Sequence, residues 1–475
     1  MSFSPFFRVS VFGVLFFGVL AGISVAETLS LETYLKQVQA RNQAVRSSMM
    51  SMEAVTLRAK EAGFLYSPTF FSDFQAMSDS RRLQNPSFQG SKTDYLMGSS
   101  GIEVQTEFGL QASLSYQLSY TSIVGASSVF VPQANFFDVR PLLSVNYPLM
   151  RNSGGKDTRS AFDVIEAQSL VKLYSESYKV KQLLAEAETA YWRLVLAHEM
   201  VEIQIKVLQK AYQIRDWAAN RVKLQLADRS DLLQVEAVAQ LRELELQSAK
   251  DELSDAARAF NVARGEDAET VSEVLVSLDS VGLRTLEIPA RADFREDVLA
   301  AKQAYRLASL NAKLSDAVYD PSLDLFGSIA LNRRDSNAID AALSSFSLSF
   351  PTNVVGIKYK MSLDGGRISD VKKGIVKEVE SAALSFDRKV FEQDREWKDL
   401  TQKFHDVKKR LLISQKMEAI QKEKWSYELD RHRQGRTTTY QVIMFEQDYT
   451  NAYSSRLRIE ADLLRLFTQL KTFGS

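Results

Sequence analysis

The 475-residue chain contains no cysteine, only three histidines and no excess of either charge. Without cysteine it has no disulfide framework and no thiol to carry a lipid anchor after a signal sequence. Its 59 basic residues balance 59 acidic residues, so no charge excess points to nucleic acid. P-loop, dinucleotide-binding and zinc-binding motifs are missing, and His198, His405 and His432 give poor support to a catalytic constellation. We therefore expect neither an enzyme nor a bound cofactor or metal.

Long hydrophobic runs are also missing from most of the chain. Arg8, the apolar stretch Val9–Val19 and the small residues Ser24-Val25-Ala26 are typical of a signal peptide that is cleaved before Glu27. We predict that residues 1–26 are this signal peptide and that the mature chain is exported. After it, no apolar run reaches the roughly 20 residues of a transmembrane helix. If the mature chain crosses a membrane, it must do so with β-strands.

Alternating apolar and polar residues predict several strands. From Ile102 to Tyr120 the even-numbered positions share one apolar face and the odd-numbered positions one polar face, without a break. This run predicts a single strand, longer than the roughly 9–11 residues that cross a bilayer. Further candidate strands cover residues 137–149, 323–331, 346–350 and 355–361, with a bend at Pro351.

The alternation fits two architectures. A soluble sandwich gives the same pattern, and four or five strands are too few for a closed transmembrane barrel, which starts at about 8. The pattern alone leaves open a soluble sheet and a barrel to which several chains contribute strands.

The chain is also internally duplicated. Gly154-Gly155-Lys156 recurs as Gly365-Gly366-Arg367, 211 residues later, whereas Pro68 recurs as Pro321, 253 residues later. The difference between these offsets indicates an insertion of about 42 residues in the first copy. A repeat of this length is a duplicated domain rather than a short solenoid unit.

Very long helices follow each Gly-Gly pair. Residues 156–223 contain no proline and no glycine, and as one helix they would extend about 100 Å. Apolar residues at coiled-coil spacing predict seams over residues 180–212, 379–411 and 442–470. His198, Gln393 and Arg456 interrupt these seams, and a polar seam residue usually sets the register or faces water. We find no second metal ligand at a suitable spacing from His198.

Five segments resemble the TolC-like outer-membrane efflux proteins, the outer-membrane factors of tripartite pumps. They are residues 147–155 (a Pro-Leu pair and a Gly-rich turn), 295–301 (the start of repeat two), 321–323 (a strand entry), 363–367 (the second Gly-rich turn) and 431–437 (an Arg-x-x-x-Gly helix-hairpin turn). Each motif is weak alone, but their order, spacing and duplication are together specific.

The resemblance implies a membrane α+β protein. Its expected fold is a trimeric 12-stranded transmembrane β-barrel, with four strands per chain, continuous with a long periplasmic α-helical barrel. The resemblance divides the mature chain into repeat one (27–264, with strands at about 68–150), an equatorial linker (265–294) and repeat two (295–475, with strands at about 321–361). The extra residues around 85–130 would lengthen the strands or form an added extracellular hairpin.

The implied function is a passive exit duct of a tripartite efflux or type I secretion system in the cell outer membrane. The implied partners are two further copies of the chain (a homotrimer), a periplasmic adaptor, an inner-membrane transporter and outer-membrane lipid, with no nucleic acid. The alternative is an exported coiled-coil structural spacer with a soluble β head. The sequence does not name the cargo.

Two sites are implied at the helix-hairpin turns. The periplasmic gate comprises Asp231, His432, Arg433, Arg436, Thr437, Gln441 and Met444, and the adaptor-docking tips comprise Gln225, Leu226, Ala227 and Gly435. Asp231 falls at the position of the acid that ties the family's helices shut. His432 and Thr437 stand at the positions of that acid's usual partners, and Gln441 and Met444 stand at the positions of an acid pair at the pore mouth. The network is therefore altered here. The alternatives are a solvated acid near a helix start and plain helix turns.

Overall fold

The computed structural model describes residues 28–278 and 281–474. These residues form two compact units, and each unit takes segments from both predicted repeats. Of the described residues, unit 1 comprises 28–38, 190–278, 281–284 and 414–461, and unit 2 comprises 39–189, 285–413 and 462–474. The predicted signal peptide lies outside the described residues, and the predicted repeat and linker boundaries stay predictions.

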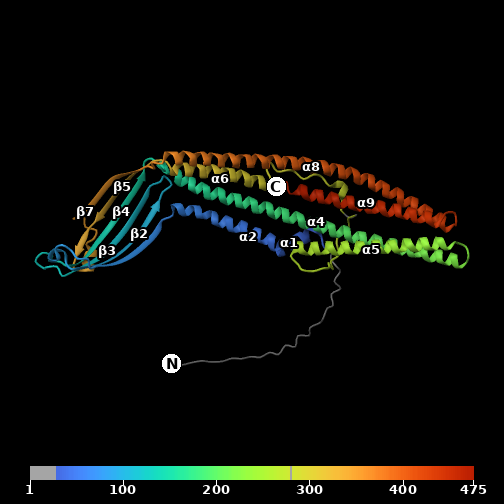
Figure 1. Cartoon of the computed structure of the whole chain (residues 1–475), viewed down its shortest axis with the longest axis horizontal. Coiled ribbons are helices and arrows are strands. Elements are labelled where there is room, and N and C mark those ends of the chain that lie inside the picture. The colour runs from blue at the N-terminus through green and yellow to red at the C-terminus, as the bar shows by residue number, and fades with distance from the viewer. Residues whose placement is uncertain (1–27, 279–280, 475) are drawn as a thin grey trace, which may run out of the picture. The chain divides into compact units, whose positions relative to one another are not determined.

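Long helices make up most of the described chain (Figure 1). The helices are α1 (Leu31–Arg41), α2 (Gln43–Arg58), η1 (Ala59–Tyr66), α3 (Pro86–Gln89), η2 (Ser153–Gly155), α4 (Lys156–Lys223), α5 (Arg229–Arg264), η4 (Leu283–Thr285), α6 (Glu296–Val318), α7 (Ala338–Leu343), α8 (Gly365–Arg433) and α9 (Thr439–Lys471). The predicted uninterrupted helix is confirmed with the same bounds as α4, and α8 is 69 residues long. Among the described residues, no helix has a stretch long and apolar enough to cross a membrane.

The predicted seams are confirmed on α8 and α9 but only in part on α4. Buried or half-buried side chains follow the whole predicted seam of α8 and of α9. On α4 the seam holds as far as Leu194, but Ile205 is 49% exposed and the buried positions shift to Ile203, Val207 and Ala211. A straight helix drifts about 20° per heptad from a strict seven-residue repeat, so a long seam turns away from its neighbour.

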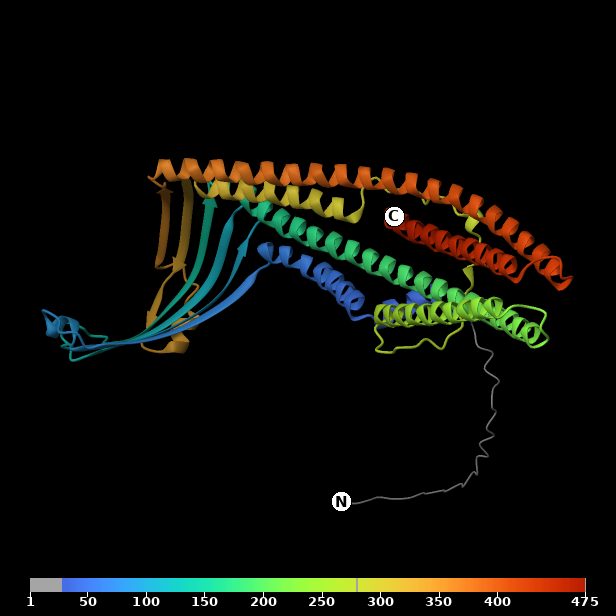
Figure 2. The same cartoon turned by 45° about the vertical axis from the view of Figure 1, so that its right-hand side comes forward.

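Gln393 shows why a polar residue interrupts the α8 seam. Its side chain is 1% exposed. Its oxygen accepts a hydrogen bond from the Arg295 backbone amide (2.8 Å), and its side-chain amide donates to the Asp293 carbonyl (3.2 Å). Both contacts lie in unit 2, where α6 runs beside the first part of α8 (Figure 2). Gln393 therefore fixes the register between α8 and the start of α6.

The strands form one antiparallel sheet within unit 2. They are β1 (Thr69–Asp79), β2 (Lys92–Gln105), β3 (Gln111–Val124), β4 (Asn135–Pro148), β5 (Ser322–Leu331), β6 (Arg333–Asp335) and β7 (Pro351–Lys360). The order is β1-β2-β3-β4-β5-β7, and β6 also pairs with β4. β6 continues β5 in one register, since Leu142 pairs with Ala330 and Val139 with Arg333. The gap between β5 and β6 lies opposite Pro141, which has no N–H to donate to the neighbouring strand. We therefore count β5 and β6 as one strand, which gives the sheet six full strands.

The alternating run at residues 102–120 is not one strand. Its first residues end β2, residues 106–110 form a turn, and the rest lies in β3. The Thr106 amide donates to the Leu110 carbonyl (2.9 Å), and the Gly109 amide donates to the Thr106 carbonyl (2.9 Å), with Gly109 at φ 85°. Because the turn has an odd length, even-numbered residues pair with even-numbered residues, and the apolar face continues through it. Alternation therefore cannot distinguish this hairpin from one long strand.

The four strands per chain that the family resemblance implies are contradicted by the sheet. The hairpin β2–β3 raises the four expected strands to six, and the extra residues form an added hairpin rather than longer strands. The candidate strand at residues 346–350 is also wrong, because these residues form a turn after α7, and the strand begins at Pro351. The candidates at 137–149 and 323–331 are confirmed as β4 and β5.

The six strands share one apolar face and one polar face. A row of paired residues runs from Phe70 through Ile102, Leu114 and Leu143 to Ile329, so the apolar sides of five neighbouring strands coincide. Exposed apolar side chains on this face are Phe70, Phe74, Leu96, Ile102, Leu114, Leu118, Leu143, Leu325, Ile329, Val355, Ile357 and Tyr359. The opposite face carries mainly polar residues, among them Gln75, Ser99, Gln111, Ser113, Ser115, Gln117, Ser119, Ser144 and Ser328. An apolar face that is exposed to this extent indicates a partner or a membrane.

Candidate functional site

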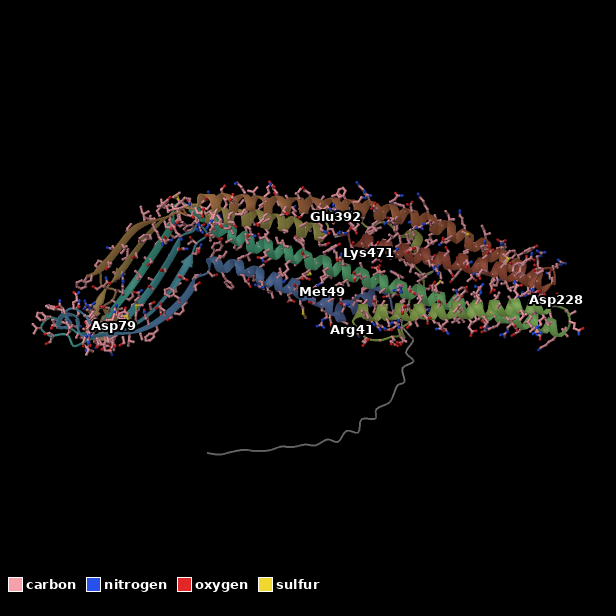
Figure 3. All side chains as sticks on the ribbon, viewed as in Figure 1. Arg41, Met49, Asp79, Asp228, Glu392 and Lys471 are labelled. Carbon is pink, nitrogen blue, oxygen red and sulfur yellow. The ribbon has the colours of Figure 1, made fainter. Side chains whose placement is uncertain are left out.

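The two helix-hairpin turns of unit 1 have the same backbone structure. The first joins α4 to α5, where Figure 3 labels Asp228, and the second joins α8 to α9. The Leu226 amide donates to the Arg221 carbonyl, and the Arg436 amide donates to the Arg431 carbonyl, both at 2.9 Å. Each bond closes a helix end over a left-handed residue, the arrangement of a Schellman motif.

The left-handed residue differs between the two turns. Gly435 has φ 68° with no atom near its Cα on the side where a Cβ would stand, so only its backbone angle requires glycine. Gln225 has φ 58° at the equivalent position, where a side chain raises the free energy of the conformation. The sequence pairs these two positions but does not reveal that Gln225 accepts this angle.

In each turn, the arginine four residues before the left-handed residue holds the backbone of the turn. Arg221 Nη2 donates to the Leu226 carbonyl (3.0 Å), and Arg431 Nη2 donates to the Arg436 carbonyl (3.3 Å). Arg431 also forms an ion pair with Glu428 (3.2 Å), which is 4% exposed. The arginine therefore satisfies a carbonyl that the helix end leaves without a partner.

The surfaces of the two turns differ. The first turn exposes Leu224 (68%) and Leu226 (62%), whereas Ala227 beside them is half-buried. The second turn exposes Gly435 and Arg436. Sequence reasoning missed Leu224, although an apolar residue at the end of a solvent-exposed helix is itself a signal for a docking surface.

The residues predicted to form the gate do not all come together. Asp231 is exposed in the first turn of α5, and among the described residues its carboxylate makes no hydrogen bond or ion pair. The chain therefore does not bring Asp231 to Arg433 or His432. Arg433 instead pairs with Asp430 at 3.2 Å.

His432 lies under the second turn and is 8% exposed. Its Nε2 is 3.2 Å from Thr439 Oγ1, and its ring centroid is 4.4 Å from that of Trp217. Burial, followed by the nearby Arg221 guanidinium, lowers the pKa of His432. His432 therefore joins the two hairpins as a neutral packing residue.

Thr437 and Gln441 do meet, through an acid that the sequence did not single out. The Thr437 hydroxyl donates to Glu428, and its oxygen lies within hydrogen-bond distance of the Gln441 side-chain oxygen. Met444 is 45% exposed beyond this group. The second turn thus has a polar network around Glu428, and Asp231 is not part of it.

Deeper in unit 1, α5 and α9 bury charged side chains. Glu446 is 3% exposed, and burial raises its pKa to about 7, against the opposing effect of Arg242 and Lys210. Arg242 is 1% exposed and donates to Glu245 (2.8 Å). A pocket of about 780 Å³, lined by Gln204 and Arg242 among others, opens beside this cluster.

Arg456, the polar residue of the α9 seam, forms a second buried network. It is 6% exposed and donates to both Glu460 oxygens at 2.9 and 2.8 Å, and it also pairs with Glu418. Glu460 is 2% exposed, so the ion pair is almost fully removed from water. Of the two roles expected for a polar seam residue, Arg456 therefore has that of setting the register and does not face water.

Comparisons with known proteins identify the fold. No family model matches the sequence, and no curated protein matches it. Similar solved structures include the outer membrane protein VceC of Vibrio cholerae (14% identity, TM-score 0.67, 94% of this chain and 96% of that chain), the open outer membrane channel MtrE of Neisseria gonorrhoeae (13%, 0.65, 93% and 88%) and the CmeC outer membrane channel of Campylobacter jejuni (12%, 0.64, 93% and 84%). The likeness extends over nearly the whole chain.

Proposed function

We propose that this chain, which has the fold of the TolC-like outer-membrane factors, is a subunit of an exit duct in the outer membrane. The sheet carries the proposal. One of its faces exposes a continuous set of apolar side chains, the other is mainly polar, and both edge strands lack a neighbouring strand among the described residues. Such a sheet fits a barrel wall with lipid outside and water inside.

A single chain cannot complete this wall. Unpaired strand edges are costly in lipid, and only a closed barrel satisfies every backbone group there. Copies of the chain that pair β7 with β1 of the next copy leave no strand edge unpaired. The family resemblance implies that three copies do so. Apart from the short β6, the strands are 10 to 14 residues long. Each is therefore long enough to cross a bilayer, which takes roughly 9–11 residues.

The helices supply the periplasmic part of the duct. α4 and α8 have 68 and 69 residues, each about 100 Å at 1.5 Å per residue. Their turns at Gln225 and Gly435 would meet a periplasmic adaptor, with Leu224 and Leu226 as apolar anchors. An inner-membrane transporter would provide the energy, so the duct itself needs no catalytic residue.

The gate at the periplasmic end rests on Asp231. Its carboxylate is exposed and has no partner among the described residues of its own chain, which leaves it available to a neighbouring copy. We place its partner among the arginines of the second turn, Arg433 and Arg436. One exposed pair contributes at most about 1 kcal/mol, so several copies must act together.

Membrane fractionation and native mass measurement test this function. The full chain, expressed with its own leader, should sediment with outer membranes and give the mass of three copies in mild detergent. A strain that lacks the chain should accumulate the cargo of the inner-membrane transporter that the duct serves. A water-soluble oligomer that needs no detergent would instead support the alternative, an exported coiled-coil spacer with a soluble β head.

A further inference from the structure

The hairpin β2–β3 is the insertion in repeat one. The repeat pairs Pro68 with Pro321 and Gly154 with Gly365, so β1 and β4 match the two full strands of repeat two, β5 and β7. The insertion of about 42 residues falls between β1 and β4, where β2 and β3 lie. Repeat two has no counterpart of this hairpin among its described residues.

The hairpin is a full part of the sheet. β2 and β3 have 14 residues each, at least as many as any neighbour. β2 pairs with β1 over 11 positions, and β3 pairs with β4 over 12 positions, in continuous antiparallel registers. The apolar face runs through both strands, since Ile102 and Leu114 lie between Phe70 and Leu143 in one row.

The inner turn of the hairpin is also fixed to the start of α4. A Cβ on Gly155 would lie 1.8 Å from the Glu107 carbonyl oxygen, and Gly155 has φ 77°. Gln105 Nε2 donates to Thr158 Oγ1 (2.8 Å), and Arg159 Nη1 donates to the Glu107 carbonyl (3.4 Å). The junction is therefore shaped around the inserted turn.

The matching junction of repeat two has no such shape. Gly365 and Gly366 begin α8, and their nearest crowding atom is Asp364 Oδ1 at 3.9 Å from a Cβ on Gly366. The left-handed angles at Gly154 and Gly155 have no equivalent there. The Gly-Gly pair of repeat one thus serves the inserted hairpin as well as the helix start.

The edges of the six-stranded sheet suit a second copy of the same chain. An even number of antiparallel strands leaves β1 and β7 running in opposite directions. Head-to-tail packing therefore sets β7 of one copy antiparallel to β1 of the next, and a rotation that closes makes a ring. β1 has 11 residues and β7 has 10, so the two edges match in length.

We infer that three copies close an 18-stranded barrel, with β2 and β3 of every copy in its wall, instead of the 12-stranded barrel that the family resemblance implies. This inference rests on the proposed trimeric duct. Barrel diameter grows roughly linearly with strand number, so the mouth is about 1.5 times as wide. The face that β3 turns to the lumen is uncharged over Gln111, Ser113, Ser115, Gln117, Ser119 and Thr121. The exit therefore suits hydrated cargo larger than a 12-stranded barrel passes, and Glu103 of β2 is the one charged residue that β2 and β3 turn to the lumen.

Single-cysteine spin labelling in lipid vesicles tests the wall, because the chain has no cysteine of its own. Labels at Leu118 should be accessible to oxygen in the lipid, and labels at Gln117 to a water-soluble nickel chelate. Ile329 and Ser328 on β5 are the matched controls. Alternation on β5 without alternation on β3 would overturn the inference and identify the hairpin as a plug or an outer loop.

Counting strands provides an independent measurement. Electron cryomicroscopy of the detergent-solubilised trimer should show 18 strands, and a polyethylene glycol series should enter the outer mouth up to a size about 1.5 times the limit of a 12-stranded barrel. A trimer with 12 strands would refute only the inserted wall. A native mass of one chain would instead refute the trimeric duct itself.

Discussion

Gln225 and Gly435 hold the same left-handed backbone angle, φ 58° and 68°, at equivalent positions of the two helix-hairpin turns. Gly435 adopts this angle without an energetic penalty, whereas the Cβ of Gln225 makes the angle unfavourable. We expect Gln225→Gly to raise the free energy of unfolding by about 0.5–1 kcal/mol and Gly435→Ala to lower it by about 1–2 kcal/mol. Thermal unfolding in detergent measures both, and Gly435→Asn, which tolerates the angle, is the control.

The same position tests adaptor docking. Gly435→Val adds a branched side chain to a left-handed residue on an exposed turn, so it should distort the tip and abolish export. Trimer mass and outer-membrane location should stay unchanged, because the sheet is remote in sequence and belongs to the other unit. Export at the normal rate would remove the turn from the docking surface.

Asp231 tests the gate through single-channel conductance in planar bilayers. Asp231→Asn removes the charge at nearly constant size and should raise the conductance severalfold, because the pairs that hold the end closed are lost together. Asp228→Asn is the matched control, since Asp228 is an exposed acid three residues earlier that caps no backbone amide. Equal, small conductance in the wild type and both variants would leave Asp231 a solvated acid near a helix start.

Glu446 should make the stability of the chain depend on pH. Its folded pKa of about 7 lies above the usual 4.5, so the folded state binds more protons than the unfolded state between these values. The contribution of Glu446 to stability is therefore full below about pH 4.5. It falls by on the order of 3 kcal/mol per chain as the pH rises from there, and the loss is smaller below pH 7 than above it. Glu446→Gln should remove this fall and raise the melting temperature at pH 8.

The control for Glu446 is its counterpart in the first hairpin. Glu236 occupies the matching repeat position but is exposed, so Glu236→Gln should leave the pH dependence of the melting temperature unchanged. His432 gives the stability the opposite pH dependence, because burial lowers its pKa and the folded state then binds fewer protons than the unfolded state. The difference between wild-type and Glu446→Gln curves isolates the acid, and parallel curves would show that Glu446 is solvated.

Arg456 should be costly to remove alone but not together with its partner. Arg456→Leu takes the bidentate partner from Glu460, which is 2% exposed, and should destabilise unit 1 by about 3–5 kcal/mol. The double variant Arg456→Leu with Glu460→Leu should recover most of this loss. Arg465→Leu breaks an exposed pair with Asp462 and should cost below about 1 kcal/mol. Equal losses in the single and double variants would show that the pair is not coupled.

Patterns confined to one element determined much of this molecule from the sequence. The bounds of α4 follow from the absence of proline and glycine, and the seams of α8 and α9 follow from apolar spacing. The repeat offsets located the insertion between β1 and β4. At the candidate site, the Arg-x-x-x-Gly segment identified the second turn, whose arginine fastens the backbone. The helix, seam and turn signals each depend on residues that are near one another in the chain, so local physics fixes their outcome, whereas the repeat offsets come from comparing two copies of one sequence pattern.

Tertiary structure decided what these patterns leave undetermined. The turn at Thr106–Leu110 has an odd length, so the chain reverses while the alternation continues, and only strand pairing reveals six strands instead of four. The drift of the α4 seam depends on how a straight helix meets its neighbours. Whether Asp231 has a partner, and whether Glu428 binds Thr437, depends on side chains from separate elements. Direction, pairing and burial are relations between distant segments, and a pattern along one segment carries no record of them.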